Sequence, residues 1–122
     1  MDPYLLFLAK RRSATPYIYA YDLDADAALN GGWSLFPTDA ERARIRAIRD
    51  AHELDLLARI ERAPPAAFVF IDDSPLVTWA DARADFREHC PRAAPFVDRR
   101  YRAAADFGPV HVLLRRDAPD AR

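Results

Sequence analysis

The chain has 122 residues, is 51% hydrophobic and 30% charged, and carries a formal net charge of −1, which is the composition of one ordinary globular domain. So small a charge gives no long-range attraction to nucleic acid, which is not expected as a partner, and an anionic membrane would need a local basic patch. The single cysteine, Cys90, excludes an intrachain disulfide and a thiolate metal site. The longest apolar runs, residues 4–9 and 66–71, fall far short of the roughly 20 residues that span a bilayer.

The first predicted element is a short helix over residues 4–11, with Asp2 as N-cap and Pro3 at the first helical position. This helix is apolar on nearly every side, so it has to be covered by the sheet of its own domain or by a membrane or partner. Aromatic and β-branched residues then favour a strand over residues 17–21. A glycine-containing loop over residues 30–37 follows.

A long helix is predicted to begin at Thr38, because Thr38 and Glu41 have the spacing of a capping box. Pro64 and Pro65 end it. Glu53 is expected to lie on its polar side, away from the apolar stripe. The stripe consists of Ile45, Ile48, His52, Leu56 and Ile60.

Residues 66–71 are apolar on both faces, which favours a strand in a central position of the sheet. Thr78 and Asp81 form a weaker capping box for the next helix, which Pro91 ends. The apolar side of that helix consists of Trp79, Ala82, Phe86 and Cys90. A short helical turn is expected over residues 94–99.

The last predicted element is an antiparallel hairpin of residues 101–107 and 110–114 around Gly108 and Pro109, followed by a disordered tail over 117–122. Together the elements predict a single α/β domain over residues 1–122. Its sheet is expected to be mixed, with about four strands, a right-handed first crossover and helices packed on it.

The segment 68–75 is the strongest indication of a binding site, because an apolar strand ends in Asp72, Asp73 and Ser74 at the kind of sheet edge where α/β proteins bind ligands. If the first two strands are parallel neighbours, Asp22 and Asp24 would lie near this edge, and the acids could share Mg²⁺. Loop solubility with local Asx turns is the favoured interpretation, so no metal or cofactor is expected.

No catalytic residue is predicted, because the histidines lack zinc-ligand spacing, Ser74 lacks a nucleophile elbow and Cys90 has no base evident from the sequence. Trp33 could stack on a sugar ring or lipid headgroup, although packing under its own loop is favoured. The candidate substrate-binding residues are Asp72, Asp73, Ser74, Asp22, Asp24 and Trp33.

Three segments of the second half, 63–65, 68–75 and 101–116, carry a family resemblance: two prolines before an apolar strand that ends in Asp, then a Tyr-x5-Phe-Gly segment leading to a last strand. They resemble the C-terminal extracytoplasmic domain of bacterial polytopic glycosyltransferases of the dolichyl-phosphate-mannose protein mannosyltransferase and aminoarabinose transferase-like group. Residues 4–17 resemble the segment that follows the last membrane helix of the same proteins.

The resemblance implies an accessory domain on the periplasmic face of the inner membrane that positions a polyprenyl-phosphate-linked sugar donor or the acceptor. Its implied partners are the transmembrane portion of the same polypeptide and the lipid-linked sugar or acceptor. The catalytic aspartate of that family is implied to lie in an early loop that this chain does not contain, so no catalytic role passes to Asp72 or Asp73. The alternatives are a stand-alone α/β binding module, which would suit the cytoplasm, and a magnesium-dependent hydrolase or transferase that uses Asp72 and Asp73.

Overall fold

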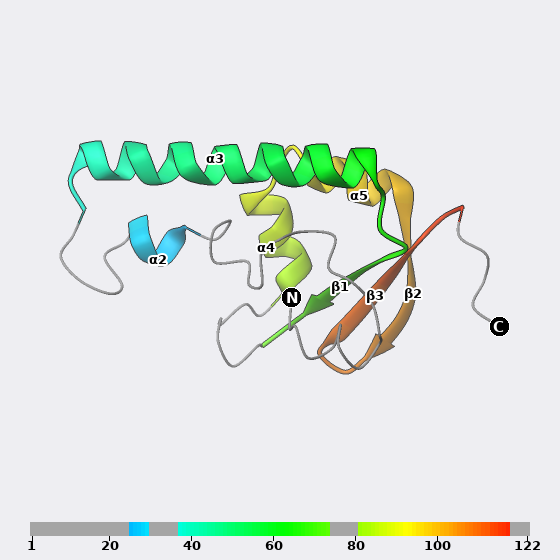
Figure 1. Cartoon of the computed structure of the whole chain (residues 1–122). Coiled ribbons are helices and arrows are strands. Elements are labelled where there is room, and N and C mark those ends of the chain that lie inside the picture. The colour runs from blue at the N-terminus through cyan, green and yellow to red at the C-terminus, as the bar shows by residue number, and fades with distance from the viewer. Residues whose placement is uncertain (1–24, 30–36, 74–80, 118–122) are drawn as a thin grey trace, which may run out of the picture.

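The computed structural model describes residues 25–29, 37–73 and 81–117. Its elements are α2 (Asp26–Leu29), α3 (Asp39–Arg62), β1 (Ala67–Ile71), α4 (Ala82–His89), α5 (Ala94–Arg100), β2 (Tyr101–Phe107) and β3 (Val110–Arg115). Helix α3 lies along one side of the sheet, with α4 between its middle and the strands and α5 beside its C-terminal end (Figure 1). The prediction of an α/β fold with a C-terminal antiparallel hairpin is confirmed.

The described strands form a three-stranded antiparallel sheet in the order β1-β3-β2. Within this part of the chain β3 is central and β1 has one described neighbour, so the expected central position of residues 66–71 stays a prediction. Apolar residues on both faces of a strand indicate that both faces are covered, but they do not determine the position of that strand in the sheet. The predicted strand over 17–21, which would make the sheet mixed, lies outside the described residues, as does the predicted helix over 4–11.

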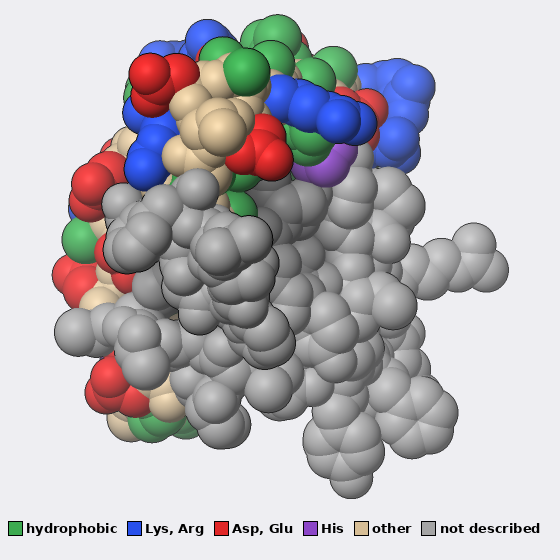
Figure 2. All heavy atoms as spheres, turned by 90° about the vertical axis from the view of Figure 1, so that its left-hand side faces the viewer, with side chains coloured by type: hydrophobic (Ala, Val, Ile, Leu, Met, Phe, Trp, Pro, Cys, Tyr) green, Lys and Arg blue, Asp and Glu red, His purple; other side chains and the backbone are tan. Residues whose placement is uncertain are grey.

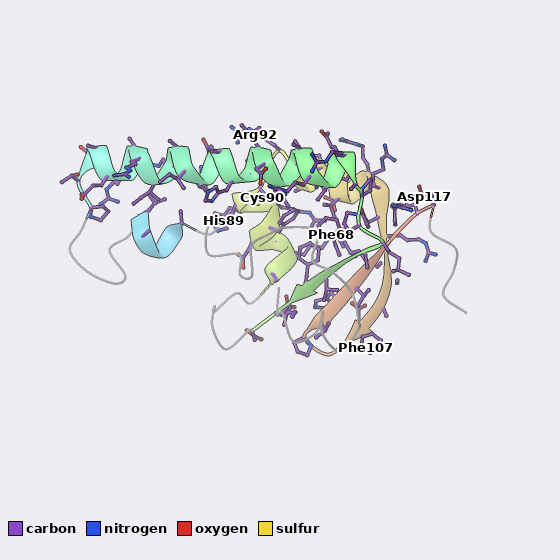
Figure 3. The ribbon with its side chains drawn as sticks, viewed as in Figure 1. Phe68, His89, Cys90, Arg92, Phe107 and Asp117 are labelled. Atoms are coloured by element: carbon purple, nitrogen blue, oxygen red, sulfur yellow. The ribbon has the colours of Figure 1, made fainter. Side chains whose placement is uncertain are left out.

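The hydrophobic core lies between the sheet and the helices, and Tyr101 is at its centre with 1% of its surface exposed. The Tyr101 ring meets Phe68 edge to face at 4.8 Å between centroids, and its hydroxyl donates to the Pro65 carbonyl at 2.7 Å. Burial raises the pKa of this hydroxyl, which keeps it a donor. Phe68 and Cys90 lie on the side of the sheet that faces α3, whereas Phe107 lies at the far end of the hairpin (Figure 3).

Helix α3 begins as predicted, since the Thr38 amide donates to Glu41 Oε2 at 2.7 Å and the Glu41 amide donates to Thr38 Oγ1 at 3.3 Å. The Thr38 amide and then the Thr38 hydroxyl, which both donate to the Glu41 carboxylate, lower the pKa of that carboxyl. The predicted stripe is only partly correct. Its C-terminal members Leu56 and Ile60 are buried, but Ile48 is 45% exposed, because the N-terminal half of α3 runs beyond the sheet (Figure 1).

Helix α4 begins later than predicted, at Ala82, because Asp81 is the N-cap and accepts from the Arg83 and Ala84 amides at 3.0 and 2.8 Å. Thr78, the cap expected from the sequence, lies outside the described residues. The predictions of a short helix over 94–99 and of a turn at 108–109 are confirmed: α5 occupies Ala94–Arg100, and Gly108 takes a φ of 60° in the hairpin turn, a conformation that favours glycine. Among the described helices, none is both long and apolar enough to cross a bilayer.

Candidate functional site at the end of the sheet

The structure describes two of the six predicted site residues, and both lie directly after β1. Asp72 is partly buried, and its backbone amide donates to the Pro109 carbonyl at 2.8 Å, which ties the end of β1 to the hairpin turn. Asp73 is exposed and has a φ of 48°, a left-handed conformation that aspartate tolerates in turns. Ser74, Asp22, Asp24 and Trp33 lie outside the described residues.

His111 joins this strand end to the hairpin by contacting one carboxylate with each ring nitrogen. Its Nε2 lies 2.7 Å from Asp72 Oδ2, and its Nδ1 lies 2.7 Å from Asp106 Oδ1. The other oxygen of Asp72 accepts from the Ala82 amide, the first of α4, at 2.8 Å. The three side chains therefore link β1, the start of α4 and both hairpin strands.

The sheet register explains why these side chains meet. His111 on the central strand faces Phe70 of β1 on one side and Asp106 of β2 on the other. Asp72 follows β1 by one residue, so it reaches the same end of the sheet. We refer to Asp72, His111 and Asp106 as the acid–imidazole bridge.

The contacts within the acid–imidazole bridge favour the charged form of His111 and of Asp72. Hydrogen bonds to Asp106 and then to Asp72 raise the pKa of His111. The Ala82 amide and then the His111 ring lower the pKa of Asp72. Both shifts favour an imidazolium between two carboxylates, a state in which both ring nitrogens donate and neither can accept a proton.

This arrangement suits recognition better than proton transfer. A general base needs a ring nitrogen with an available lone pair near the substrate, and in the imidazolium both nitrogens face carboxylates. The carboxylate oxygens keep further lone pairs and can accept from hydroxyl or ammonium groups. Within the described ranges, no group of three or more His, Cys, Asp or Glu side chains is arranged to hold a metal ion.

Two of the three bridge residues, Asp106 and His111, were not singled out as site residues from the sequence. A signal was present, because a two-residue turn at 108–109 pairs residue 107 with 110 and 106 with 111, as the structure confirms. The contact with Asp72 depends on β1 pairing with β3, a long-range choice that no local pattern contains.

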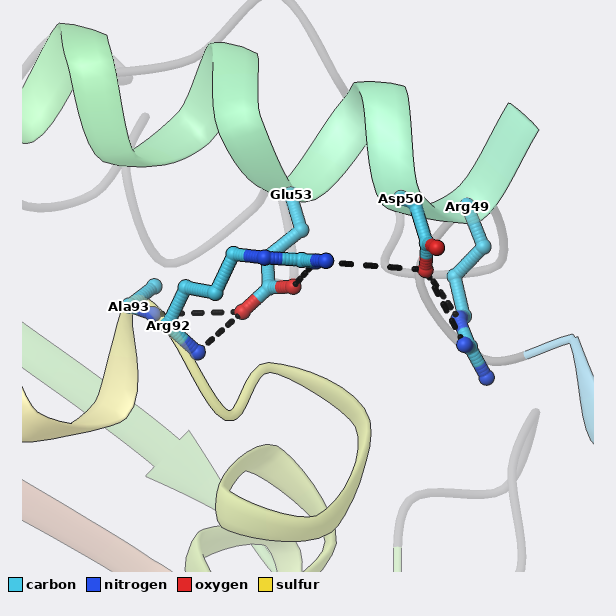
Figure 4. A network of polar contacts seen from close by, with 5 residues as sticks. All are labelled: Arg49, Asp50, Glu53, Arg92 and Ala93. Carbon is cyan, nitrogen blue, oxygen red and sulfur yellow. Dashed lines mark hydrogen bonds and ion pairs between the residues drawn. The ribbon is translucent and has the colours of Figure 1, made fainter. Parts of the chain in front are cut away.

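A second polar cluster lies where α3 meets the start of α5 (Figure 4). Glu53 is 1% exposed; its Oε1 accepts from the Arg92 and Ala93 amides at 2.6 and 3.2 Å, and its Oε2 pairs with Arg92 Nη1 at 2.7 Å. The expected position of Glu53 on the polar side of α3 is therefore wrong. Glu53 therefore holds the turn that leads into α5, through the amides of the two residues before that helix, and has a structural role.

Around the end of the molecule at which α3 begins, arginine and acidic side chains are interspersed and no single charge dominates the coloured surface (Figure 2). Comparisons of the chain with protein-family models, curated proteins and solved structures gave no match.

Proposed function

We propose that this chain is a non-catalytic, extracytoplasmic domain of a membrane glycosyltransferase that uses polyprenyl-phosphate-linked sugars. Its partner would be the transmembrane portion of the same polypeptide, at the periplasmic face of the inner membrane. The segments that carry the family resemblance include β1, β2 and β3 and the hydrogen bond between Tyr101 and Pro65. These segments therefore supply all the described strands of one sheet, which supports treating them as parts of a single resemblance.

The observation that carries the proposal is the closed pairing of the acid–imidazole bridge. His111 is the histidine nearest to the predicted binding edge, and both of its nitrogens lie 2.7 Å from carboxylate oxygens. In its protonated state such a ring holds a geometry and has no lone pair with which to accept a proton. A domain that positions a ligand needs the geometry alone.

The charge at this end of the sheet favours the sugar over the phosphate as the group it positions. Among the described residues, Asp72, Asp73 and Asp106 outnumber the one cationic ring of His111, so a phosphate group would meet a net negative charge from them. Sugar hydroxyls instead donate to carboxylates. We therefore propose that the edge formed by Asp72, Asp73 and the acid–imidazole bridge contacts the sugar or the acceptor hydroxyls.

The test is an amide NMR titration of the purified chain with methyl mannoside and, separately, with inorganic phosphate. Saturable shifts at residues 72, 73, 106 and 111 with the glycoside alone are expected. Asp73→Asn should weaken them, because it removes the charge of the exposed carboxylate while asparagine tolerates the left-handed backbone at this position. Glu88→Ala, which removes an exposed acid of α4, is the matched control and should change nothing.

Two outcomes would contradict the proposal. Phosphate shifting these amides more strongly than the glycoside would refute the sugar assignment. Turnover of a polyprenyl-phosphate sugar by the purified chain would refute a non-catalytic role. The genomic prediction is separate: the reading frame should encode many apolar segments upstream of this domain.

A further inference from the structure

The two carboxylates of the acid–imidazole bridge differ in how far they are exposed to solvent. Both contacts measure 2.7 Å, yet the Asp72 side chain is 20% exposed and the Asp106 side chain is 70% exposed. Asp72 is also held by the Ala82 amide through its other oxygen. Asp106 can therefore exchange the imidazole for water at little cost, whereas Asp72 is poorly placed to do so.

When His111 loses one proton, it can keep only one of its two hydrogen bonds to carboxylates. An imidazolium donates from both nitrogens, but a neutral imidazole donates from one and presents a lone pair at the other. A lone pair 2.7 Å from a carboxylate oxygen is repulsive. One of the two contacts must then open.

We infer that His111 is a proton-operated clasp, which at low pH ties β2 to the β1–α4 connection and on deprotonation releases Asp106 while it keeps Asp72. The neutral ring carries its hydrogen on Nε2, because the less hydrated carboxylate has the greater need of a donor. The β2 end of the hairpin, with the 67% exposed Phe107 next to Asp106, then loses its side-chain tie to Asp72 and keeps its backbone pairing with β3.

The direction of the pH effect follows from the groups that face the ring. In the described structure the charged groups that act on it are Asp106 from β2 and Asp72 after β1, while α4 contributes the Ala82 amide to Asp72. Both carboxylates raise the pKa of His111 above its ordinary value of 6.5. The clasp is therefore fully closed below that value and opens as the pH rises through the raised pKa. The clasp rests on the contacts of His111 and does not depend on the proposed role of the chain in a glycosyltransferase.

The test is the imidazole ¹⁵N NMR spectrum of the full chain as a function of pH, with His111 assigned by through-bond correlation from its backbone resonances. The expected result is a His111 pKa above 6.5 and, beyond it, the Nε2–H tautomer. The Nδ1–H tautomer at high pH, or an unshifted pKa, would overturn the inference. Because this measurement uses the unaltered chain, it does not depend on a variant that folds.

A second measurement compares urea unfolding of the wild type and Asp106→Asn at about pH 5.5 and about pH 9, on either side of the transition. The wild type should be the more stable at the lower pH, and the two should converge at the higher pH. Each unit by which Asp106 raises the His111 pKa corresponds to a tenfold difference in the folding equilibrium constant. Equal differences at both pH values would contradict the clasp, and Glu88→Gln is the control that should show no pH-dependent difference.

Discussion

Replacing Glu53 with alanine tests whether a buried acid of α3 holds the start of α5. The change removes the acceptor of two backbone amides and the partner of Arg92. A buried donor left without an acceptor costs about 1–3 kcal/mol. The Arg92 side chain is 47% exposed, so water replaces much of its lost contact. We therefore expect Glu53→Ala to lower the free energy of unfolding by about 3 kcal/mol, below the upper end of about 5 kcal/mol for broken buried pairs.

Two further variants separate the amides from the ion pair in urea unfolding experiments. Glu53→Gln keeps an acceptor oxygen for the amides and should cost about 1–2 kcal/mol, whereas Arg92→Ala removes a half-exposed partner and should cost about 1 kcal/mol or less. Glu61→Ala, at an exposed position of the same helix, should stay within about 0.5 kcal/mol of wild type. If Arg92→Ala proves as costly as Glu53→Ala, the ion pair dominates, and the argument that Glu53 acts mainly through the two amides is refuted.

Three other predictions concern the core, the hairpin and an ion pair. Tyr101→Phe removes the hydrogen bond to Pro65 and should lower the free energy of unfolding by about 1 kcal/mol; no change in urea unfolding would show that the bond contributes nothing. Gly108→Ala should cost about 1–2 kcal/mol through its left-handed backbone alone, since an added Cβ meets nothing within 4 Å; a much larger loss in the same assay would point to a clash. Two arginines of α4 lower the pKa of Asp98, so its contribution is present above the ordinary pKa of 3.8 and is lost as the pH falls through the lowered value; Asp98→Asn should therefore flatten the acid limb of a pH–stability curve, and an unchanged limb would contradict this.

Local signals in the sequence were sufficient for most of the described elements. The capping box of Thr38 and Glu41 set the start of α3, and the turn at Gly108 set the hairpin, because both depend on contacts within a few residues. The sequence did not determine which half of α3 meets the core. Ile48 and Ile60 both belong to the predicted stripe, but of the two only Ile60 joins the described core cluster, which includes Phe70 and Leu113 of the sheet.

The candidate site shows the same division between local and long-range information. Asp72 could be found from the abrupt end of an apolar strand. Its partner His111 lies 39 residues away and meets it only because β1 pairs with β3. Glu53 was misplaced for a related reason. Its spacing of three to Leu56 and seven to Ile60 puts it on the buried side, but its charge favoured the solvent side as long as its partners, the amides just before α5, were unknown.

The burial of Cys90 gives this protein a built-in probe of its own opening. It is the single thiol in the chain and is 1% exposed beneath α3, at the residue that ends α4. A thiol-reactive dye can therefore modify the folded molecule only when the helices separate from the sheet, and the labelling rate measures how often they do so. Unfolding frequency can thus be followed in dilute, native buffer, without an engineered reporter and with no second sulfhydryl to confuse the signal.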